Sequence, residues 1–63
     1  MPEIGQIRMW NKRAQGRRDI GECFLVISVR GEEGPVITLL QGGHFTGGWT
    51  PEYISFCSDL IQE

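Results

Sequence analysis

Apolar and polar positions are most clearly patterned between Glu22 and Gln41. Two apolar runs, ECFLVISVR and PVITLLQ, flank the short polar segment GEEG. Runs rich in β-branched residues on either side of a short loop that contains glycine are typical of a β-hairpin. The pattern therefore predicts two antiparallel strands here and places the chain in the mainly β class.

The first run also predicts which side chains face the core. Its odd positions are all apolar and are expected to point inward: Cys23, Leu25, Ile27 and Val29. Phe24 and Val26 then fall on the nominally exposed side. Two explanations stay open for these two residues, either a sheet that curls so that both faces are covered or contact with a partner.

The segments before and after the hairpin add further elements. Ile4 to Trp10 predicts another strand, with Ile7 and Met9 on one face and Trp10 on the other. Residues 11–21, NKRAQGRRDIG, predict a long polar loop. The segment GGHFTGGW predicts either a sharp bend or loop, or the start of a short fourth strand.

The C-terminal segment allows two interpretations. Thr50-Pro51-Glu52 is a good helix start, with a hydroxyl N-cap, proline at the first position and an acid in the first turn. Its apolar residues keep helical spacing up to Gln62: Tyr53, Phe56, Cys57, Leu60 and Ile61. The residue types are mediocre helix formers, however. Either one helix spans Pro51 to Gln62, or a short helix, Pro51 to Phe56, precedes a last strand around Asp59 to Gln62.

Length and charge limit the function. With 63 residues and a net charge of −2, the chain is expected to form a single domain, residues 1–63. A domain of this size buries only about 60% of the surface of its unfolded chain, which leaves no room for a deep, dry catalytic cavity. No apolar stretch has the length of a membrane span, so we expect no membrane partner and a cytoplasmic location, in a host cell or a virion.

The residues that could carry chemistry do not form a known motif. Cys23 and Cys57 are expected to be buried, reduced thiols, with a single bridge as the alternative. With His44 they have no metal-ligand spacing, and no catalytic pair is indicated. Gly48-Trp49 stands where a phosphate-binding loop needs Lys-Ser/Thr. We therefore predict no enzyme activity, no metal and no cofactor.

The loop carries the clearest positive signal. Four of the six Lys and Arg residues lie within seven positions: Lys12, Arg13, Arg17 and Arg18. Trp10 precedes them, and an aromatic platform beside cations is used to bind single strands or phosphate backbones. A solvated loop and a loop that contacts an acidic protein surface are the other interpretations.

The aromatic residues give a second signal. Five rings cannot all fit inside so small a core: Trp10, Phe24, Phe45, Trp49 and Tyr53. Rings left outside the core indicate a contact surface, since Trp and Tyr carry much of the binding energy at interfaces. The alternative is that Phe45 and Trp49 cap the open ends of a small barrel.

The order of elements resembles an SH3-like barrel, and the ending WTPEYISFCSDLI resembles the close of very small SH3-like proteins encoded by tailed bacteriophages. The resemblance implies a mainly β, small five-stranded SH3-like barrel with a short helical turn near the C-terminus. In such a layout, the loop beside Trp10 and the Trp49–Tyr53 corner are expected to approach each other and to line a groove for an extended or proline-rich peptide. A three-stranded antiparallel sheet plus a C-terminal helix is the alternative. No family catalytic residues carry over, and the resemblance implies a binding or structural accessory protein.

These observations predict a non-enzymatic protein-interaction or assembly module, encoded by a phage or mobile element, with a virion decoration or connector subunit as one form. The predicted contact residues are Trp10, Phe24, Trp49 and Tyr53, with Arg13, Arg17 and Arg18 steering the encounter. Its partner would be another protein, from the host or a virus, or a second copy. The alternative is a small nucleic-acid-binding barrel that uses loop residues 12–18.

Overall fold

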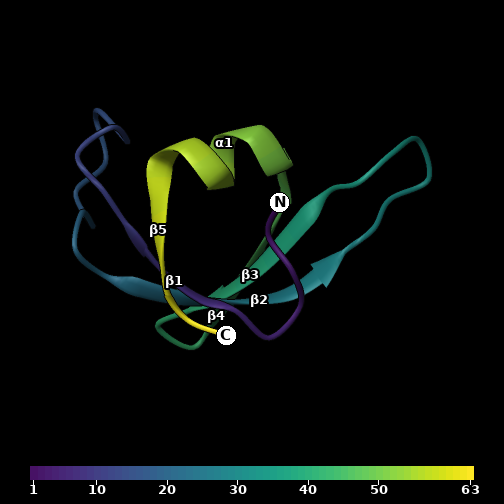
Figure 1. Cartoon of the computed structure of the whole chain (residues 1–63), viewed down its shortest axis with the longest axis horizontal. Coiled ribbons are helices and arrows are strands. Elements are labelled where there is room, and N and C mark those ends of the chain that lie inside the picture. The colour runs from purple at the N-terminus through teal and green to yellow at the C-terminus, as the bar shows by residue number, and fades with distance from the viewer.

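The computed structural model describes residues 1–63 and contains five strands and one short helix (Figure 1). The elements are β1 (Ile7–Trp10), β2 (Cys23–Val29), β3 (Ile37–Gln41), β4 (His44–Trp49), α1 (Pro51–Cys57) and β5 (Ser58–Gln62). The prediction of a mainly β, five-stranded domain with a short helix near the C-terminus is confirmed. The alternative of three strands plus a C-terminal helix is wrong, because β4 and β5 both join the sheet.

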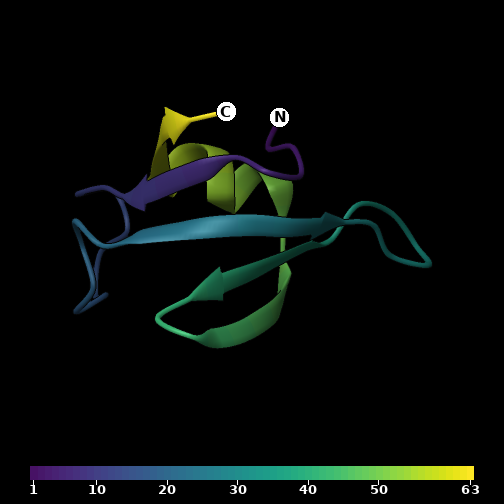
Figure 2. The same ribbon diagram turned by 90° about the horizontal axis from the view of Figure 1, so that it is seen from below.

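All five strands form one antiparallel sheet in the order β4-β3-β2-β1-β5. The last strand pairs with the first, with Met9 opposite Asp59 and Trp10 opposite Ser58. Register shifts interrupt three of the four pairings, between β1 and β5, β2 and β3, and β3 and β4. Such irregularities bend and twist strands, and Figure 2 shows the strands fanning from β5 and β1 to β4. The sheet stays open, with β4 and β5 as its two edges.

The glycine segment forms a hairpin rather than a loop. Gly42 and Gly43 connect β3 to β4 with φ angles of 56° and 79°. Positive φ at both central residues is the geometry of a tight two-residue hairpin turn, which glycine adopts without strain. Of the two alternatives for GGHFTGGW, the short fourth strand is therefore the observed one.

Helix α1 is short and is followed by a strand, as the second C-terminal interpretation predicts. Thr50 is an extended N-cap, and its hydroxyl accepts the Tyr53 backbone N–H at 3.1 Å. Pro51 occupies the first turn, and the chain becomes extended again at Ser58. The short helix therefore runs one residue further than predicted, and the last strand begins one residue earlier. No helix of the chain has the length and hydrophobicity needed to cross a bilayer.

The core lies between the sheet and α1, on the face opposite to the one predicted. In β2, Phe24 and Val26 are buried, while Cys23 is exposed and Leu25 is only partly buried. The assignment of the odd positions of β2 to the core is wrong. Both faces of this strand are apolar, and the buried one is the face that α1 covers. The core cluster consists of Trp10, Ala14, Phe24, Val26, Ile37, Leu39, Ile54 and Cys57.

The same face carries a buried arginine. Arg8 is 9% exposed and lies next to Gln6 and Ser58, which are also buried. Its guanidinium donates to Ser58 Oγ at 2.8 Å, to the Ser58 carbonyl oxygen at 3.2 Å and to Gln6 Oε1 at 3.1 Å. Every buried side-chain nitrogen and oxygen has a hydrogen-bond partner. The core is therefore part apolar and part polar, with the polar part under β5.

Candidate functional site

The basic loop between β1 and β2 is folded against the body of the domain. Ala14 at its centre is 1% exposed and belongs to the core. Turn hydrogen bonds join Ala14 N to Asn11 O at 3.1 Å and Arg17 N to Ala14 O at 3.3 Å. At its base, Gly21 N donates to Trp10 O at 2.9 Å. The loop therefore presents its cations in fixed positions.

A closed ring of contacts holds Arg17. Its Nε and Nη2 donate to the two carboxylate oxygens of Asp19, each at 2.7 Å. Asp19 also accepts Gln41 Nε2 at 2.8 Å, and Gln41 in turn accepts the Trp10 indole N–H at 2.9 Å. Arg17 Cζ lies 3.9 Å from the centroid of the Trp10 ring, which closes the ring of contacts. We call Trp10, Arg17, Asp19 and Gln41 the Arg17 ring.

The Arg17 ring shifts the pKa of both charged members. The hydrogen bonds from Arg17 lower the pKa of Asp19 from 3.8 to about 2. The hydrogen bond to Asp19 raises the pKa of Arg17, and Tyr53 contributes in the same direction. Because a two-pronged carboxylate contact occupies this guanidinium, Arg17 is a fixed part of the surface and not a free cation.

Two aromatic side chains, Trp49 and Tyr53, continue from the Arg17 ring to the surface. Trp10 lies 5.4 Å from Trp49, and Trp49 stacks on Tyr53 at 5.5 Å between centroids. Arg17 Cζ lies 5.2 Å from the Trp49 ring. The predicted approach of the loop to the Trp49–Tyr53 corner is therefore confirmed. Trp49 is partly buried and Tyr53 is 37% exposed.

A second arginine contacts the other exposed ring of α1. Arg13 Cζ lies 5.2 Å from the centroid of Phe56, and Arg13 Nη1 donates to the Phe56 carbonyl oxygen at 3.4 Å. Asn11 Nδ2 donates to the same oxygen at 3.1 Å. Phe56 is 61% exposed. The loop is thus attached to the helix on both sides, and we call Arg13, Arg17, Trp49, Tyr53 and Phe56 the loop–helix surface.

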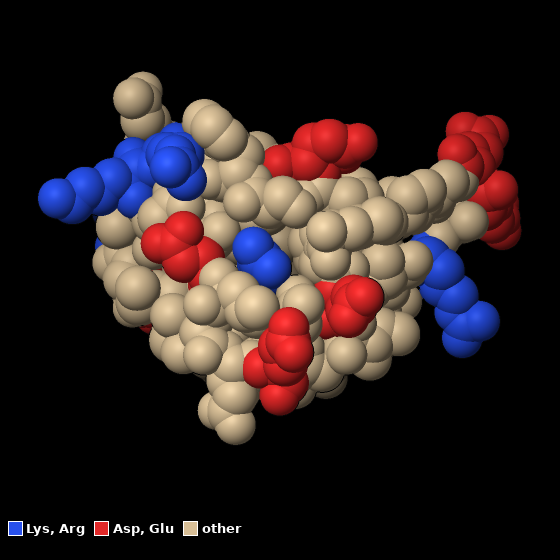
Figure 3. All heavy atoms as spheres, in the orientation of Figure 1, with Lys and Arg blue, Asp and Glu red and all other residues tan.

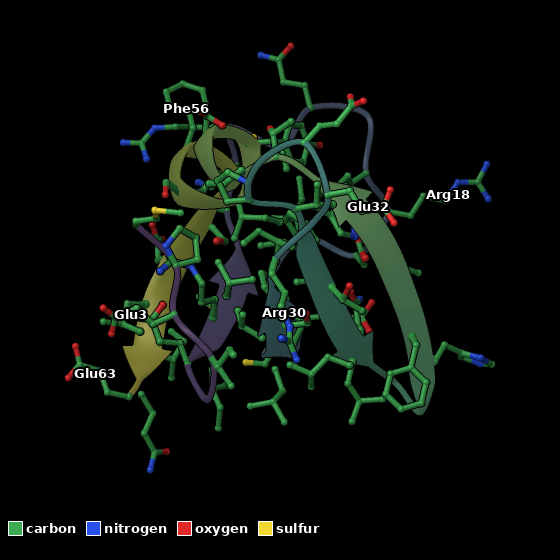
Figure 4. The ribbon with its side chains drawn as sticks, turned by 90° about the vertical axis from the view of Figure 1, so that its right-hand side faces the viewer. Glu3, Arg18, Arg30, Glu32, Phe56 and Glu63 are labelled. Atoms are coloured by element: carbon green, nitrogen blue, oxygen red, sulfur yellow. The ribbon has the colours of Figure 1, made fainter.

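Two of the predicted contact residues are not accessible. Trp10 is 0% and Phe24 is 2% exposed, and their rings lie 4.6 Å apart in the core. Their placement on an exposed face is wrong, because α1 covers the side of the sheet on which they lie. Arg13, Arg17, Trp49 and Tyr53 do come together, as part of the loop–helix surface. Arg18 extends from the loop into solvent, away from Phe56 (Figure 4).

The exposure of Phe56 was not predicted from the sequence. Helical spacing groups it with Cys57, Leu60 and Ile61 on an apolar stripe, which indicates burial. The helix ends at Cys57, so the stripe is interrupted and Phe56, Leu60 and Ile61 remain 61%, 43% and 52% exposed. The poor helix propensity of this segment was the signal that could have revealed the exposure.

The basic loop is the densest cluster of positive charge. Its Lys and Arg side chains gather at one end of the molecule, while Glu32 and Glu33 lie on the β2–β3 loop at the opposite tip and the other acidic side chains are spread over the surface between them (Figure 3). At the loop–helix surface, cations of the loop lie beside exposed aromatic rings. Such combinations are enriched at protein interfaces.

The reactive side chains lie apart. Cys23 is exposed and Cys57 is buried, and both are free thiols. The expectation that both thiols are buried is wrong for Cys23, and the disulfide alternative is wrong as well. His44 lies exposed on β4, and no group of three or more His, Cys, Asp or Glu side chains could hold a metal ion.

Comparison of the chain with protein-family models, with curated proteins and with solved structures finds no match.

Proposed function

We propose that this chain is a non-enzymatic protein-interaction or assembly module and that the loop–helix surface is its contact surface. The observation that carries the proposal is the arrangement of two exposed rings of α1. Phe56 lies beside Arg13, and Tyr53 stacks on Trp49, which lies beside Arg17. A phage or mobile-element origin and a role as a virion decoration or connector subunit remain part of this proposal.

The arrangement favours binding because it is preorganised. Tyr, Trp and Arg dominate the residues that carry most binding energy at interfaces. Binding is weakened when long side chains must be immobilised, at about 0.5–1.5 kcal/mol for each. Arg17 and Arg13 are already held by Asp19 and by the Phe56 carbonyl oxygen. A partner would therefore meet a surface whose cations lose little freedom on binding.

The nucleic-acid alternative loses two of its supports. Base stacking needs an accessible ring, and the Trp10 ring is fully buried. Arg17 is neutralised by Asp19 at 2.7 Å. The exposed loop cations that remain are Lys12, Arg13 and Arg18. Because these three cations remain available, nucleic-acid binding is kept as the second candidate function and is tested on the same variants of the chain.

The experiment is selection from a display library of random peptides on the immobilised domain. Peptides that bind are then tested on three variants, Phe56→Ala, Tyr53→Ala and Phe45→Ala. Phe45 is a matched control, because it is 67% exposed and lies on β4, outside the loop–helix surface. We expect Phe56→Ala and Tyr53→Ala to weaken binding about tenfold or more, and Phe45→Ala to leave it unchanged.

Two results contradict the proposal. One is the absence of any selected peptide that depends on Tyr53 or Phe56. The other is tight binding of single- or double-stranded DNA that persists at physiological salt and is lost in Arg18→Ala. The same variants in sedimentation analysis report whether the loop–helix surface serves a second copy, since self-association would then also depend on Phe56.

A further inference from the structure

Beside the loop–helix surface lies an open groove of about 460 Å³. It is bounded by the end of β1, by both ends of the basic loop and by Asp59 of β5. Its apolar lining comes mainly from Met9 and from Ile20, which is 43% exposed. The groove is continuous with the loop–helix surface through Arg13, which lines it and also stacks on Phe56.

The charges of the groove favour an anionic ligand. Lys12 and Arg13 both line it and both are exposed. Asp59 is the only acidic residue of the lining, and its Oδ1 accepts Asn11 Nδ2 at 3.1 Å. Asp59 also lies close enough to the buried Arg8 to raise the pKa of that guanidinium against the larger lowering by burial. The two cations of the lining outnumber its single carboxylate, so the groove carries a net positive charge.

We infer that this groove binds an extended, acidic segment of a partner protein. Carboxylates of the segment contact Lys12 and Arg13, and an aliphatic side chain between them packs on Met9 and Ile20. This inference rests on the proposed function and names the chemistry of the partner. Charge complementarity carries the choice of an acidic segment, since the two cations of the lining outnumber its one carboxylate, Asp59.

The same observations disfavour a nucleic acid as the occupant. Trp10 contributes to the groove only from a fully buried ring, so no base can stack on it. Two cations neutralise few phosphates, and such binding is lost as salt rises. An apolar wall built from Met9 and Ile20 has no counterpart on a phosphate backbone, whereas a leucine side chain fits it.

The test uses a labelled peptide of repeated Glu-Glu-Leu, followed by fluorescence anisotropy with the full chain. Two control peptides separate the two contacts, Gln-Gln-Leu without the charges and Glu-Glu-Ser without the aliphatic anchor. We expect each control to bind about tenfold more weakly than the acidic peptide, with the charge contribution reduced at higher salt.

Variants of the chain locate the binding. We expect Lys12→Glu and Arg13→Glu each to weaken binding of the acidic peptide about tenfold. Arg18→Glu is the matched control, because it makes the same charge change in the same loop but lies outside the groove. It should change binding less than about twofold. Ile20→Ser tests the apolar contact, and circular dichroism confirms that each variant is folded.

Several outcomes overturn the inference. These are equal binding of the acidic and the neutral peptide, no binding of either, an equal loss in Arg18→Glu, or tighter binding of an oligothymidylate than of the acidic peptide. Failure here is distinct from failure of the proposed function. If substitution of Phe56 weakens the binding of selected peptides but substitution of Lys12 or Ile20 does not, the proposed function of the loop–helix surface is retained. The inference that the groove binds an acidic segment is then contradicted.

Discussion

Arg8 and Arg17 both lie close to the core but are stabilised in different ways. Arg8 is 9% exposed, and its guanidinium contacts only neutral oxygens, from Ser58 and Gln6. The Arg17 side chain is 23% exposed and pairs with both oxygens of Asp19. Burial lowers the pKa of Arg8, while the hydrogen bond to Asp19 raises the pKa of Arg17.

The difference shows which arginine stabilises the fold. A buried charge loses its hydration, and neutral acceptors recover only part of that free energy. Arg8 therefore makes the fold dependent on its acceptors without adding stability of its own. Arg17 keeps some hydration, gains a carboxylate and lies on the Trp10 ring. It stabilises the loop from which the contact surface is built.

The largest effect is expected from Ser58→Ala. Ser58 Oγ accepts Arg8 Nε at 2.8 Å and donates to the Ile54 carbonyl oxygen, so its removal takes one of three acceptors from a buried charge and the hydroxyl donor from a buried carbonyl. We expect a loss of about 2–4 kcal/mol in the free energy of unfolding, measured by urea denaturation. Ser55→Ala, at an exposed position of α1, is the control and should cost less than about 0.5 kcal/mol. Equal losses in the two variants would contradict the dependence of Arg8 on Ser58.

At Asp19 the effect depends on pH. The folded state lowers the pKa of Asp19 to about 2, so its contribution is present above the ordinary pKa of about 3.8 and is lost as pH falls through the folded value. We expect Asp19→Asn to be about 1 kcal/mol less stable than the natural chain near neutral pH, because partial exposure weakens the pair. The difference should shrink from about pH 4 to pH 2. A difference that stays constant over this range would show that the Asp19 charge does not stabilise the Arg17 ring.

A smaller loss is expected from Arg17→Lys. Lysine keeps the charge but loses the two-pronged contact with Asp19 and the flat stacking on Trp10. We expect a loss of about 0.5–1 kcal/mol by urea denaturation. Arg18→Lys serves as the control, since that side chain extends into solvent (Figure 4). If both substitutions are neutral, the Arg17 ring adds nothing to stability.

Local patterns in the sequence were sufficient to predict most of the strands and the start of the helix. The paired apolar runs predicted the β2–β3 hairpin, and Thr50 with Pro51 predicted where α1 begins. The poor helix formers that follow predicted that the helix is short, because no favourable propensity opposes the change to β5 at Ser58. Each of these depends on neighbours within a few residues.

Features that depend on contacts between distant parts of the chain could not be predicted from the sequence. Alternation in β2 shows two apolar faces but not which of them α1 covers, so Phe24 and Cys23 were assigned to the wrong sides. Arg8 could not be placed in the core, because its main acceptor, Ser58, lies 50 positions further along the chain. The loop was found from its charge, but the capture of Arg17 by Asp19 and Gln41 needed the β3–β4 turn to be in place.

The last prediction makes the same substitution at both arginines. Arg8→Met should leave the stability unchanged or raise it by up to about 1 kcal/mol, because methionine fills similar volume without a charge. The former acceptors keep other bonds, since Gln6 Oε1 still accepts the Glu3 N–H at 3.2 Å and Ser58 Oγ still donates to Ile54. Arg17→Met should instead lower the free energy of unfolding by about 1 kcal/mol, because Asp19 is left with only Gln41 as a side-chain partner.

In the Arg8→Met background, Ser58→Ala should lower the free energy of unfolding by less than half as much as it does in the natural chain. If Ser58→Ala instead lowers the free energy of unfolding by the same amount in both backgrounds, Ser58 stabilises the fold through its hydrogen bond to Ile54 alone. The core would then accommodate Arg8 without the Ser58 hydroxyl.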